Sequence, residues 1–458
     1  MSLVRQRGEG LFGPIFHQVQ RCRVLCRTPS RPLELCSLYK DIVCHTNLRL
    51  NLSCFILLSY YCWDVFCNTL KMTKSKETIS LRVALISEQR SKYLGLGYSQ
   101  EECAALTHDG EIQAVLSTLK KLGHHTTLVL GVESLVQQLA AGKHKDWDLA
   151  FNMAQGFHWP AREAQVPALL EAYQVPYTFA DSATMALCQN KANTKIVLRH
   201  HGVPTAPFLV IPANEPASSA PKFASSGPQY PLFVKPVTEG APKGIDTFNK
   251  VNDPAELTAA VQELKSKFPG QDILVESYLP GRELTVAILG TGENSRVIGV
   301  RELIWKSQTD STNGVDGHAE LEFASRLSKS SKDNTLVYRD HDLTQPQIQA
   351  ACHVSLDVWK LLGCRDAGRI DLRFGSNKPH AVPNIMEVSI MTPSFLFLLY
   401  MTHILVAQVN PISGLLPIHS PLPGSAESNG MSYAKLLEAI IESALRRCPP
   451  TALVNGSS

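Results

Sequence analysis

Residues 233–245 read FVKPVTEGAPKGI, and this stretch is the most informative in the chain for fold and function. A short apolar strand delivers Lys235 to a glycine-rich turn. A lysine supplies a point charge for phosphate oxygens, and glycines let backbone N–H groups approach an anion closely. The order of Gly, Lys and Ser/Thr differs from that of a Walker A loop. We interpret the stretch as a candidate phosphate-binding turn, with an ordinary surface turn as the alternative.

A second stretch, ESYLPGRELTV at residues 276–286, places two carboxylates on either side of a turn between strands. The backbone of such a turn could hydrogen-bond the edge of a purine, and Glu283 could accept hydrogen bonds from ribose hydroxyls. Taken alone, the stretch is more typical of a hairpin with solvated acids, and that interpretation is the stronger of the two.

A third stretch, GRIDLRF at residues 368–374, is followed by Glu387. Arg369 and Asp371 alternate along the predicted strand, so both point to one face. Carboxylates from neighbouring strands can converge on a hard cation that also holds nucleotide phosphates, which is how proteins usually bind magnesium. The alternative is a surface ion pair.

The pattern around these stretches predicts alternating strands and helices. In residues 79–180 this alternation favours a parallel α/β sheet, and a second α/β unit and a last strand-rich unit follow. The predicted strands are 81–86, 126–130, 149–151, 232–235, 272–276, 284–289, 297–302 and 370–374. The predicted helices are 110–122, 164–173, 190–201, 254–267 and 345–362.

Composition limits the classes of protein to consider. The formal charge of +3 gives no reason to expect a nucleic-acid partner, and 44% hydrophobic with 19% charged residues is an ordinary globular balance. No CxxC pair occurs among the 12 cysteines, so the usual zinc and redox spacings are missing. Scattered cysteines suit a reducing compartment, and we expect a cytoplasmic protein.

Residues 1–71 differ from the rest, because they hold nine of the 44 Lys and Arg and seven of the 12 Cys. We expect them to be a disordered extension or a translated artefact, with the functional protein starting near Met72. A mitochondrial presequence is the alternative. A second misfit is the apolar segment within residues 389–408, which is near membrane-spanning length.

The order of these motifs resembles that of the ATP-grasp ligases. The motifs are, along the chain, Lys191, the Val-Lys-Pro at 234–236, the glycine turn, the 276–283 hinge, Arg369, Asp371 and Glu387. The stretches PGRELTVAILG (280–290) and LLGCRDAGRID (361–371) are especially similar to D-alanine–D-alanine ligase and its relatives. The resemblance covers residues 80–450, apart from the apolar segment.

The resemblance implies an α/β protein, in which a Rossmann-like parallel-sheet domain precedes a two-lobed ATP-grasp fold of the α+β type. The expected domains are an N-terminal extension (1–78), a pre-ATP-grasp domain (79–181), a central lobe (182–275) and a C-terminal lobe (276–458). The implied reaction is ATP-dependent joining of a carboxylate to an amine through an acyl phosphate, with Mg²⁺ or Mn²⁺. Amino-acid-like substrates and a homodimer are also implied.

The resemblance also assigns roles residue by residue. Lys191 and Lys235 would contact the phosphates, and the loop that closes over them would consist of Glu239, Gly240, Ala241, Lys243 and Gly244. Glu276, with Ser277, Tyr278 and Leu279, would bind adenine, and Glu283 would bind the ribose. The metal ligands would be Asp371, Glu387 and Asn410. Arg369 and the Gly414 backbone would stabilise the oxyanion, and Ser420 would bind the second substrate's carboxylate.

The family pattern Glu-Val-Asn-Pro-x-x-Gly is interrupted here. Removing residues 388–408 would restore it as Glu387-Val409-Asn410-Pro411. We therefore hypothesise that these residues are an unspliced intron or an alternative-splice insertion, rather than a membrane helix. Because Glu and Asn at i and i+2 on a strand share one face, the insertion removes the guarantee that they reach one cation. The exact chain is then expected to bind metal poorly.

Two more departures leave alternatives open. Ala241 and Pro242 stand where the family usually has serines, and Pro242 lacks an N–H donor. Asn152-Met153-Ala154-Gln155-Gly156, with Arg162-Glu163, replaces the His-Gly turn of the bacterial enzymes. A non-catalytic ATP-binding protein and a ligase for a different acid and amine therefore remain alternatives.

Overall fold

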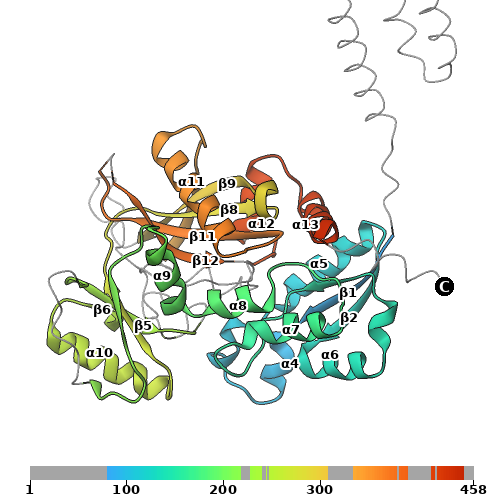
Figure 1. The fold of residues 1–458 in the computed structure, drawn as a ribbon, viewed down its shortest axis with the longest axis horizontal. Coiled ribbons are helices and arrows are strands. Elements are labelled where there is room, and N and C mark those ends of the chain that lie inside the picture. The colour runs from blue at the N-terminus through green and yellow to red at the C-terminus, as the bar shows by residue number, and fades with distance from the viewer. Residues whose placement is uncertain are drawn as a thin grey trace, which may run out of the picture. The chain divides into compact units, whose positions relative to one another are not determined.

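The structure is a computed structural model that describes residues 80–217, 227–239, 244, 247–307, 334–378, 381–389, 414–417 and 420–447. The chain divides into residues 1–77 and 78–458, and all described residues belong to the second unit. The predictions made for residues 1–71 and for most of the segment 388–408 lie outside the described residues. The α/β architecture, with one parallel and two antiparallel sheets, agrees with the expected fold class (Figure 1).

The first sheet is parallel, in the order β2-β1-β3. Its strands are β1 (Arg82–Ser87), β2 (His125–Leu130) and β3 (Leu149–Asn152). Val83 and Leu85 of β1 pack into one hydrophobic cluster, while Ala84 and Ile86 pack into another. Both faces of β1 are therefore buried, which explains why the strand reads as a continuous apolar run. The helices here are α4 (Arg90–Gly95), α5 (Asp109–Lys121), α6 (Gly131–Ala140) and α7 (Gln165–Ala172).

The second sheet is antiparallel, in the order β4-β7-β5-β6. Its strands are β4 (Phe208–Ile211), β5 (Leu232–Pro236), β6 (Lys250–Val251) and β7 (Ile273–Ser277). Two helices, α8 (Ser182–Gln189) and α9 (Lys191–His200), lead into it, and α10 (Pro254–Lys267) packs on it. Asp253 caps α10 by accepting from the N–H groups of Ala255 and Glu256, and Pro254 occupies the first turn, where no donor is needed.

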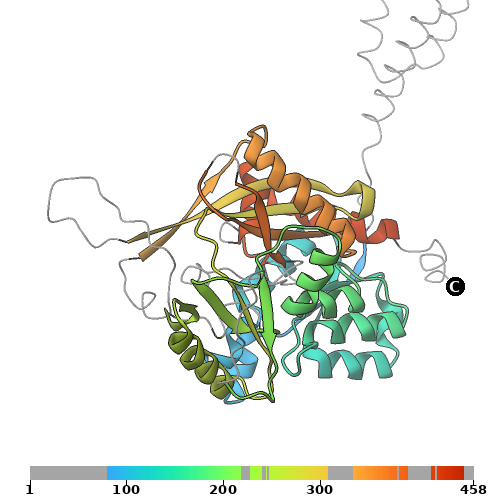
Figure 2. The same cartoon turned by 60° about the vertical axis from the view of Figure 1, so that its left-hand side comes forward.

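The third sheet has five antiparallel strands in the order β10-β9-β8-β11-β12. They are β8 (Glu283–Leu289), β9 (Arg296–Ser307), β10 (Asn334–Asp340), β11 (Ala367–Phe374) and β12 (Pro383–Ser389). Helix α11 (Pro346–Leu361) lies along this sheet, and α12 (Pro421–Ser428) contacts β8 and β9 (Figure 2). Helix α13 (Tyr433–Arg447) follows.

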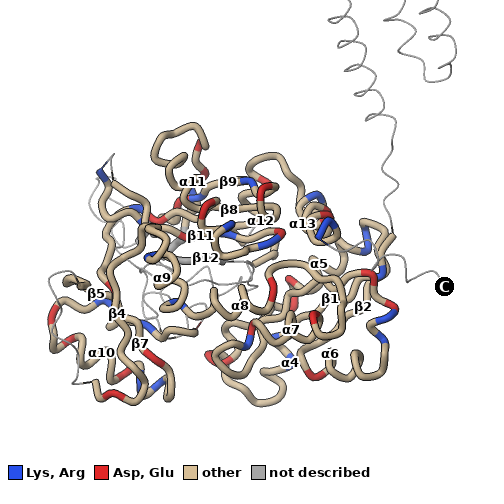
Figure 3. The backbone as a smooth tube through the Cα atoms, viewed as in Figure 1, with Lys and Arg blue, Asp and Glu red and all other residues tan. Residues whose placement is uncertain are grey.

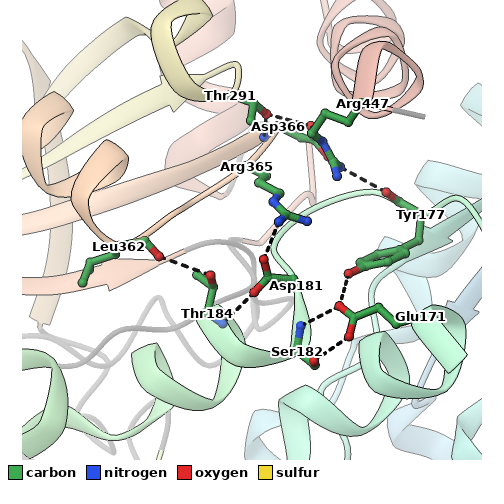
Figure 4. Close-up of polar contacts among 10 residues, drawn as sticks. All are labelled: Glu171, Tyr177, Asp181, Ser182, Thr184, Thr291, Leu362, Arg365, Asp366 and Arg447. Atoms are coloured by element: carbon green, nitrogen blue, oxygen red, sulfur yellow. Dashed lines mark hydrogen bonds and ion pairs between the residues drawn. The ribbon is translucent and has the colours of Figure 1, made fainter. Parts of the chain in front are cut away.

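Asp366, in the left-handed region at φ 64°, ties the segment after β3 to the third sheet. Its carboxylate accepts from the Phe179 N–H at 2.7 Å, from Thr291 Oγ1 at 3.1 Å and from Arg447 Nε at 3.2 Å. Figure 4 shows this network beside a second one, in which Arg365 pairs with Asp181, the N-cap of α8. Segments far apart in sequence are thereby fixed to one another.

The predicted strands and helices agree with the structure to within a few residues, except that β9 extends to Ser307. The sequence pattern did not predict α4, α6, α8, α12, α13, β4, β6 or β10. None of the helices in the described ranges has the length and apolar character that a membrane span needs.

Candidate active site

A buried cluster of two lysines and one glutamate lies at the junction of α9, β5 and β7. Lys195 Nζ lies 2.9 Å from Glu276 Oε2, and Lys235 Nζ contacts Glu276 Oε1. The β5–β7 register places Phe233 opposite Glu276, so their side chains share one face of the sheet. Lys235 lies two residues after Phe233 on β5, so its side chain is on that same face. The side chains are at most 1% exposed. The structure thus brings together Lys235 and Glu276, which the resemblance assigned to phosphate and adenine respectively.

Burial and pairing act in opposite directions on these pKa values. Burial lowers the pKa of Lys235 well below its ordinary value and also lowers that of Lys195. Burial by itself would raise the pKa of Glu276, but the two lysines more than offset it and hold that pKa below its ordinary value. The Glu276 carboxylate therefore stays ionised and neutralises part of the lysine charge.

Lys191, the first residue of α9, fixes the start of the glycine-rich turn. Its side chain is 1% exposed, and its Nζ donates to the carbonyls of Val237, at 3.3 Å, and Glu239. Gln271 Nε2 donates to the Glu239 carboxylate at 2.5 Å. Residues 240–243, which include Gly240, Ala241 and Lys243, lie outside the described residues.

Gly244 fixes the far end of the same turn. Its φ is +79°, and an added Cβ would lie 2.7 Å from the Phe268 ring and 2.9 Å from Pro236. Its carbonyl accepts from Asn249 Nδ2 at 2.8 Å. The two residues that flank the turn, Glu239 and Gly244, are therefore both held by contacts within the protein.

The hinge after β7 uses part of its backbone within the protein. The Ser277 N–H donates to the Pro207 carbonyl at 3.0 Å, and the Tyr278 N–H donates to the Pro231 carbonyl at 2.8 Å. An adenine held by this backbone would therefore use the carbonyl groups or the N–H of Leu279. Leu279 is 9% exposed.

Strand β11 carries a row of buried charged side chains. Arg369 Nε donates to Asp371 Oδ2 at 3.2 Å, and Arg373 Nη1 lies 3.8 Å from Glu283 Oε2. Burial raises the pKa of Glu283 to about 7. Asp371 Oδ1 is buried without a hydrogen-bond partner among the described residues. A hard cation would satisfy such an oxygen, so Asp371 fits the metal role that the resemblance implies.

The other two expected metal ligands are less defined. The backbone of Glu387 lies opposite Asp371 in the β11–β12 register, but its side chain and all of Asn410 lie outside the described residues. Strand β12 continues through Val388 and Ser389, and Ser389 is opposite Arg369. The position two residues after Glu387 on this strand is therefore occupied by Ser389. The described residues contain no group of three His, Cys, Asp or Glu suited to a metal.

Gly414 and Ser420 are both buried near the N-terminus of α12, where Ser420 is the N-cap residue. The N–H of Leu415, next to Gly414, donates to Glu111 Oε1 at 2.5 Å. Glu111 lies in the first turn of α5 and is 0% exposed, and burial raises its pKa to about 8. A carboxyl group from the parallel-sheet region thus holds the turn that carries Gly414.

Comparison with known proteins places these features in a family. Residues 197–394 match the family described as "D-ala D-ala ligase C-terminus", and the match ends inside the apolar segment. D-alanine–D-alanine ligase of Parvibaculum lavamentivorans is 28% identical over 328 residues, covering 71% of this chain and 89% of that protein. In sequence, the chain is therefore similar to the D-alanine–D-alanine ligases.

Other relatives agree with this assignment. An uncharacterised protein of Sinorhizobium fredii, y4sG, is 27% identical over 349 residues and covers 73% of this chain and 87% of that protein. The crystal structure of D-alanine–D-alanine ligase from Bacillus anthracis complexed with ATP shares the fold. Its TM-score is 0.53 at 18% identity, over 80% of this chain and 98% of that one.

Sequence reasoning missed two residues of this ATP-grasp site. Lys195 lies four residues after Lys191 on α9, so the helical spacing already placed the two lysines on one face. Glu111 gave no such signal, because its partner Leu415 is 304 residues away.

Proposed function

We propose that the chain is an ATP-dependent carboxylate–amine ligase. The observation that carries the proposal is the convergence of Lys191, Lys195, Lys235 and Glu276 beside a turn anchored at both ends, in a chain that matches a ligase family. Buried cations next to a glycine-rich turn are suited to nucleotide phosphates.

We assign the nucleotide contacts by the same resemblance. Lys191 and Lys235, with Lys195, would neutralise the phosphates, and the turn formed by Glu239, Gly240, Ala241, Lys243 and Gly244 would close over them. Glu276 and the backbone from Ser277 to Leu279 would hold adenine. Glu283 would accept from a ribose hydroxyl in its ionised form.

The proposed reaction has two steps. A substrate carboxylate oxygen forms a bond to the γ-phosphorus, the bond to the bridging oxygen breaks, and ADP leaves with that electron pair. The amine of the second substrate then attacks the acyl carbon, phosphate leaves, and the amine loses a proton. Arg369 and the Gly414 N–H would stabilise the oxyanion, and Ser420 would hold the second substrate's carboxylate.

Asp371, Glu387 and Asn410 are the residues that would hold Mg²⁺ or Mn²⁺ in this family pattern. The cation would neutralise charge on the transferring phosphoryl group. In the strand register, Ser389 occupies the position two residues after Glu387. Asn410 can take that position beside Glu387 only if the inserted residues are absent or loop out.

A second candidate function is ATP binding without turnover. The observation that favours it is the same register, because the exact chain places Ser389 where the family pattern has Asn. A serine hydroxyl is a weaker ligand for a hard cation than the side-chain carbonyl oxygen of asparagine.

The test compares the full chain with a version lacking residues 1–71 and 388–408. Each is supplied with ATP, Mg²⁺ and a panel of D- and L-amino acids, and phosphate release is measured. Release that depends on an amino acid supports the ligase proposal. Release only from the shortened version also supports the insertion hypothesis. ATP binding without release from either version would favour the non-catalytic function.

Three further expectations belong with this proposal. The substrates are small amino-acid-like molecules, the chain forms a homodimer as related ligases commonly do, and it acts in the cytoplasm. Sedimentation of the purified protein and fractionation of cells that express it test the last two.

A further inference from the structure

Five buried polar residues gather near the carboxyl ends of β1 and β3 and around α8. This polar cluster consists of Glu88, Asn152, Gln155, Glu163 and Gln189, each at most 4% exposed. Glu88 Oε2 accepts from the Gln155 N–H at 2.7 Å, and the Glu163 N–H donates to Gln189 Oε1 at 3.3 Å. Gly156, next to Gln155, lies against the backbone of Arg162, next to Glu163, since a Cβ added at Gly156 would lie 2.3 Å from the Arg162 carbonyl oxygen; the two pairs are therefore neighbours.

The polar cluster holds an unusual number of unpartnered atoms. Among the described residues, six of its buried side-chain atoms make no hydrogen bond: Glu88 Oε1, Asn152 Nδ2, Gln155 Oε1, Gln155 Nε2, Glu163 Oε2 and Gln189 Nε2. Buried polar groups are nearly always paired, and leaving one unpaired is unfavourable. Unpartnered carboxyl and amide oxygens together with unpartnered amide N–H groups therefore indicate that a ligand with both donors and acceptors binds there.

The position of the polar cluster points to the acid substrate. Ligands of open parallel sheets bind beyond the carboxyl ends of the strands. Arg162, next to Glu163, donates to the Thr238 carbonyl at 3.3 Å and lies 3.7 Å from the Glu239 carboxylate, at the start of the phosphate-binding turn. A molecule held by the polar cluster thus lies beside the proposed γ-phosphate, where the attacking carboxylate must be.

Gln155 narrows the chemistry further, because both polar atoms of its side chain are unpartnered while the residue is 1% exposed. A primary amide presents C=O and N–H on one edge, and its best complement is another group with the same edge. A trans peptide does not fit, since its C=O and N–H point in opposite directions. Exchanging the O and N of Gln155 leaves this complement unchanged.

We propose that the polar cluster recognises the side chain of the acid substrate, and that this side chain carries a primary carboxamide. This inference rests on the proposed ligase function and specifies its substrate. A methyl side chain such as that of alanine would leave the Gln155 amide unpaired. Sites built to hydrogen-bond a substrate group reject analogues that lack the group by factors of about 10⁴–10⁵.

The test uses the full chain with ATP and Mg²⁺. D- and L-asparagine and D- and L-glutamine are compared with D- and L-alanine by phosphate release, and binding of each is measured by calorimetry in the presence of a non-hydrolysable ATP analogue. We expect kcat/KM for one carboxamide amino acid to exceed that for alanine by about 100-fold or more. A kcat/KM for alanine equal to that for the carboxamide amino acids would overturn the inference. This comparison needs no variant of the protein.

Gln155→Leu then tests the assigned residue, with Gln137→Leu on the exposed face of α6 as the matched control. Gln155→Leu should remove most of the preference and leave ATP affinity unchanged, whereas Gln137→Leu should change neither. An equal loss for all substrates would contradict the assignment to Gln155.

The two proposals can fail separately. If no amino acid elicits phosphate release from the full chain or from the version lacking residues 1–71 and 388–408, the ligase proposal is contradicted, and calorimetry still decides the inference. Selective binding of asparagine or glutamine over alanine would support the polar cluster as a carboxamide site. Absent or unselective binding would overturn it.

Discussion

At the scale of single residues, the Lys195–Lys235–Glu276 cluster is the most sensitive electrostatic feature of the site. Removing one partner of a buried ion pair leaves a charge without compensation and typically costs about 3–5 kcal/mol. The neighbouring Lys191 adds to the repulsion, since its charge also lowers the pKa of Lys235.

We predict that Glu276→Gln lowers the free energy of unfolding by about 3–5 kcal/mol, because two buried lysines lose their carboxylate. Urea unfolding measures the change. The control is Glu263→Gln, whose exposed pair with Lys267 at 2.9 Å should contribute less than about 1 kcal/mol. Similar losses in both variants would contradict the role of the cluster.

Glu111 gives a pH-dependent prediction. Burial raises its pKa from 4.5 to about 8, against a smaller lowering by the Leu415 N–H and Arg90. A raised carboxyl pKa contributes stability that is fully present below pH 4.5 and is lost as pH rises through about 8. Glu111→Gln keeps an acceptor for Leu415 but cannot ionise.

We therefore expect the unfolding free energy of the variant to fall less than that of the parent chain between pH 5 and 9. Chemical denaturation across this range measures both curves. Glu163 has a pKa of about 8 and Glu283 a pKa of about 7, so both also lower the stability as pH rises. Both are present in the parent chain and in Glu111→Gln, so they do not cause the difference between the two curves. Parallel curves would show that Glu111 does not titrate in this range.

At the scale of elements, apolar runs and helical spacing made most strands and helices predictable. The structure adds the caps: α10 and α9 begin where the side chains of Asp253 and Asn190 accept from the first helical N–H groups. Helix α8 was missed, because its short run follows a loop without apolar periodicity. The β5–β7 register, which brings Lys235 and Glu276 to one face, was not readable from either strand alone.

The turn between β7 and β8 gives a prediction at this scale. A Cβ at Gly281 would lie 2.4 Å from the Phe374 carbonyl oxygen and 2.8 Å from that of Ser376. Gly281→Ala should therefore destabilise the protein by about 1–3 kcal/mol and weaken ATP binding, since the hinge must move. Thermal unfolding and nucleotide titration measure the two effects.

Gly375→Ala is the matched control, because a Cβ at Gly375 meets nothing within 4 Å and neither glycine has a positive φ. The control should change stability by less than about 0.5 kcal/mol. If both substitutions act alike, close packing of the hinge is not the cause.

At the scale of the whole molecule, Asp366, Arg447 and Leu362 together hold the segment from Tyr177 to Thr184 (Figure 4). Charges elsewhere in the described part are mixed in sign along the chain (Figure 3), so specific pairs such as Arg447–Asp366 matter more than a general field. Asp366 is 0% exposed.

We predict that Asp366→Asn, which tolerates the left-handed backbone, destabilises the chain by about 3–5 kcal/mol through loss of the Arg447 pair. Asp148→Asn is the control, because its partner Arg82 is 42% exposed and a surface pair contributes about 0–1 kcal/mol. Chemical denaturation compares them. An equal effect would mean that the Asp366 contacts do not hold the segment.

Periodicity and local spacing were enough to predict the α/β class and the order of the motifs, and the resemblance to a ligase family proposed which residues bind the nucleotide. The sequence also shows the interruption after Glu387. Which side chains meet depends on the tertiary structure. Lys195 with Glu276, Glu111 with Leu415, and Gln155 with Glu88 are contacts between segments that lie far apart along the chain. Sequence spacing carries no information about such contacts, since strand register and domain packing set them.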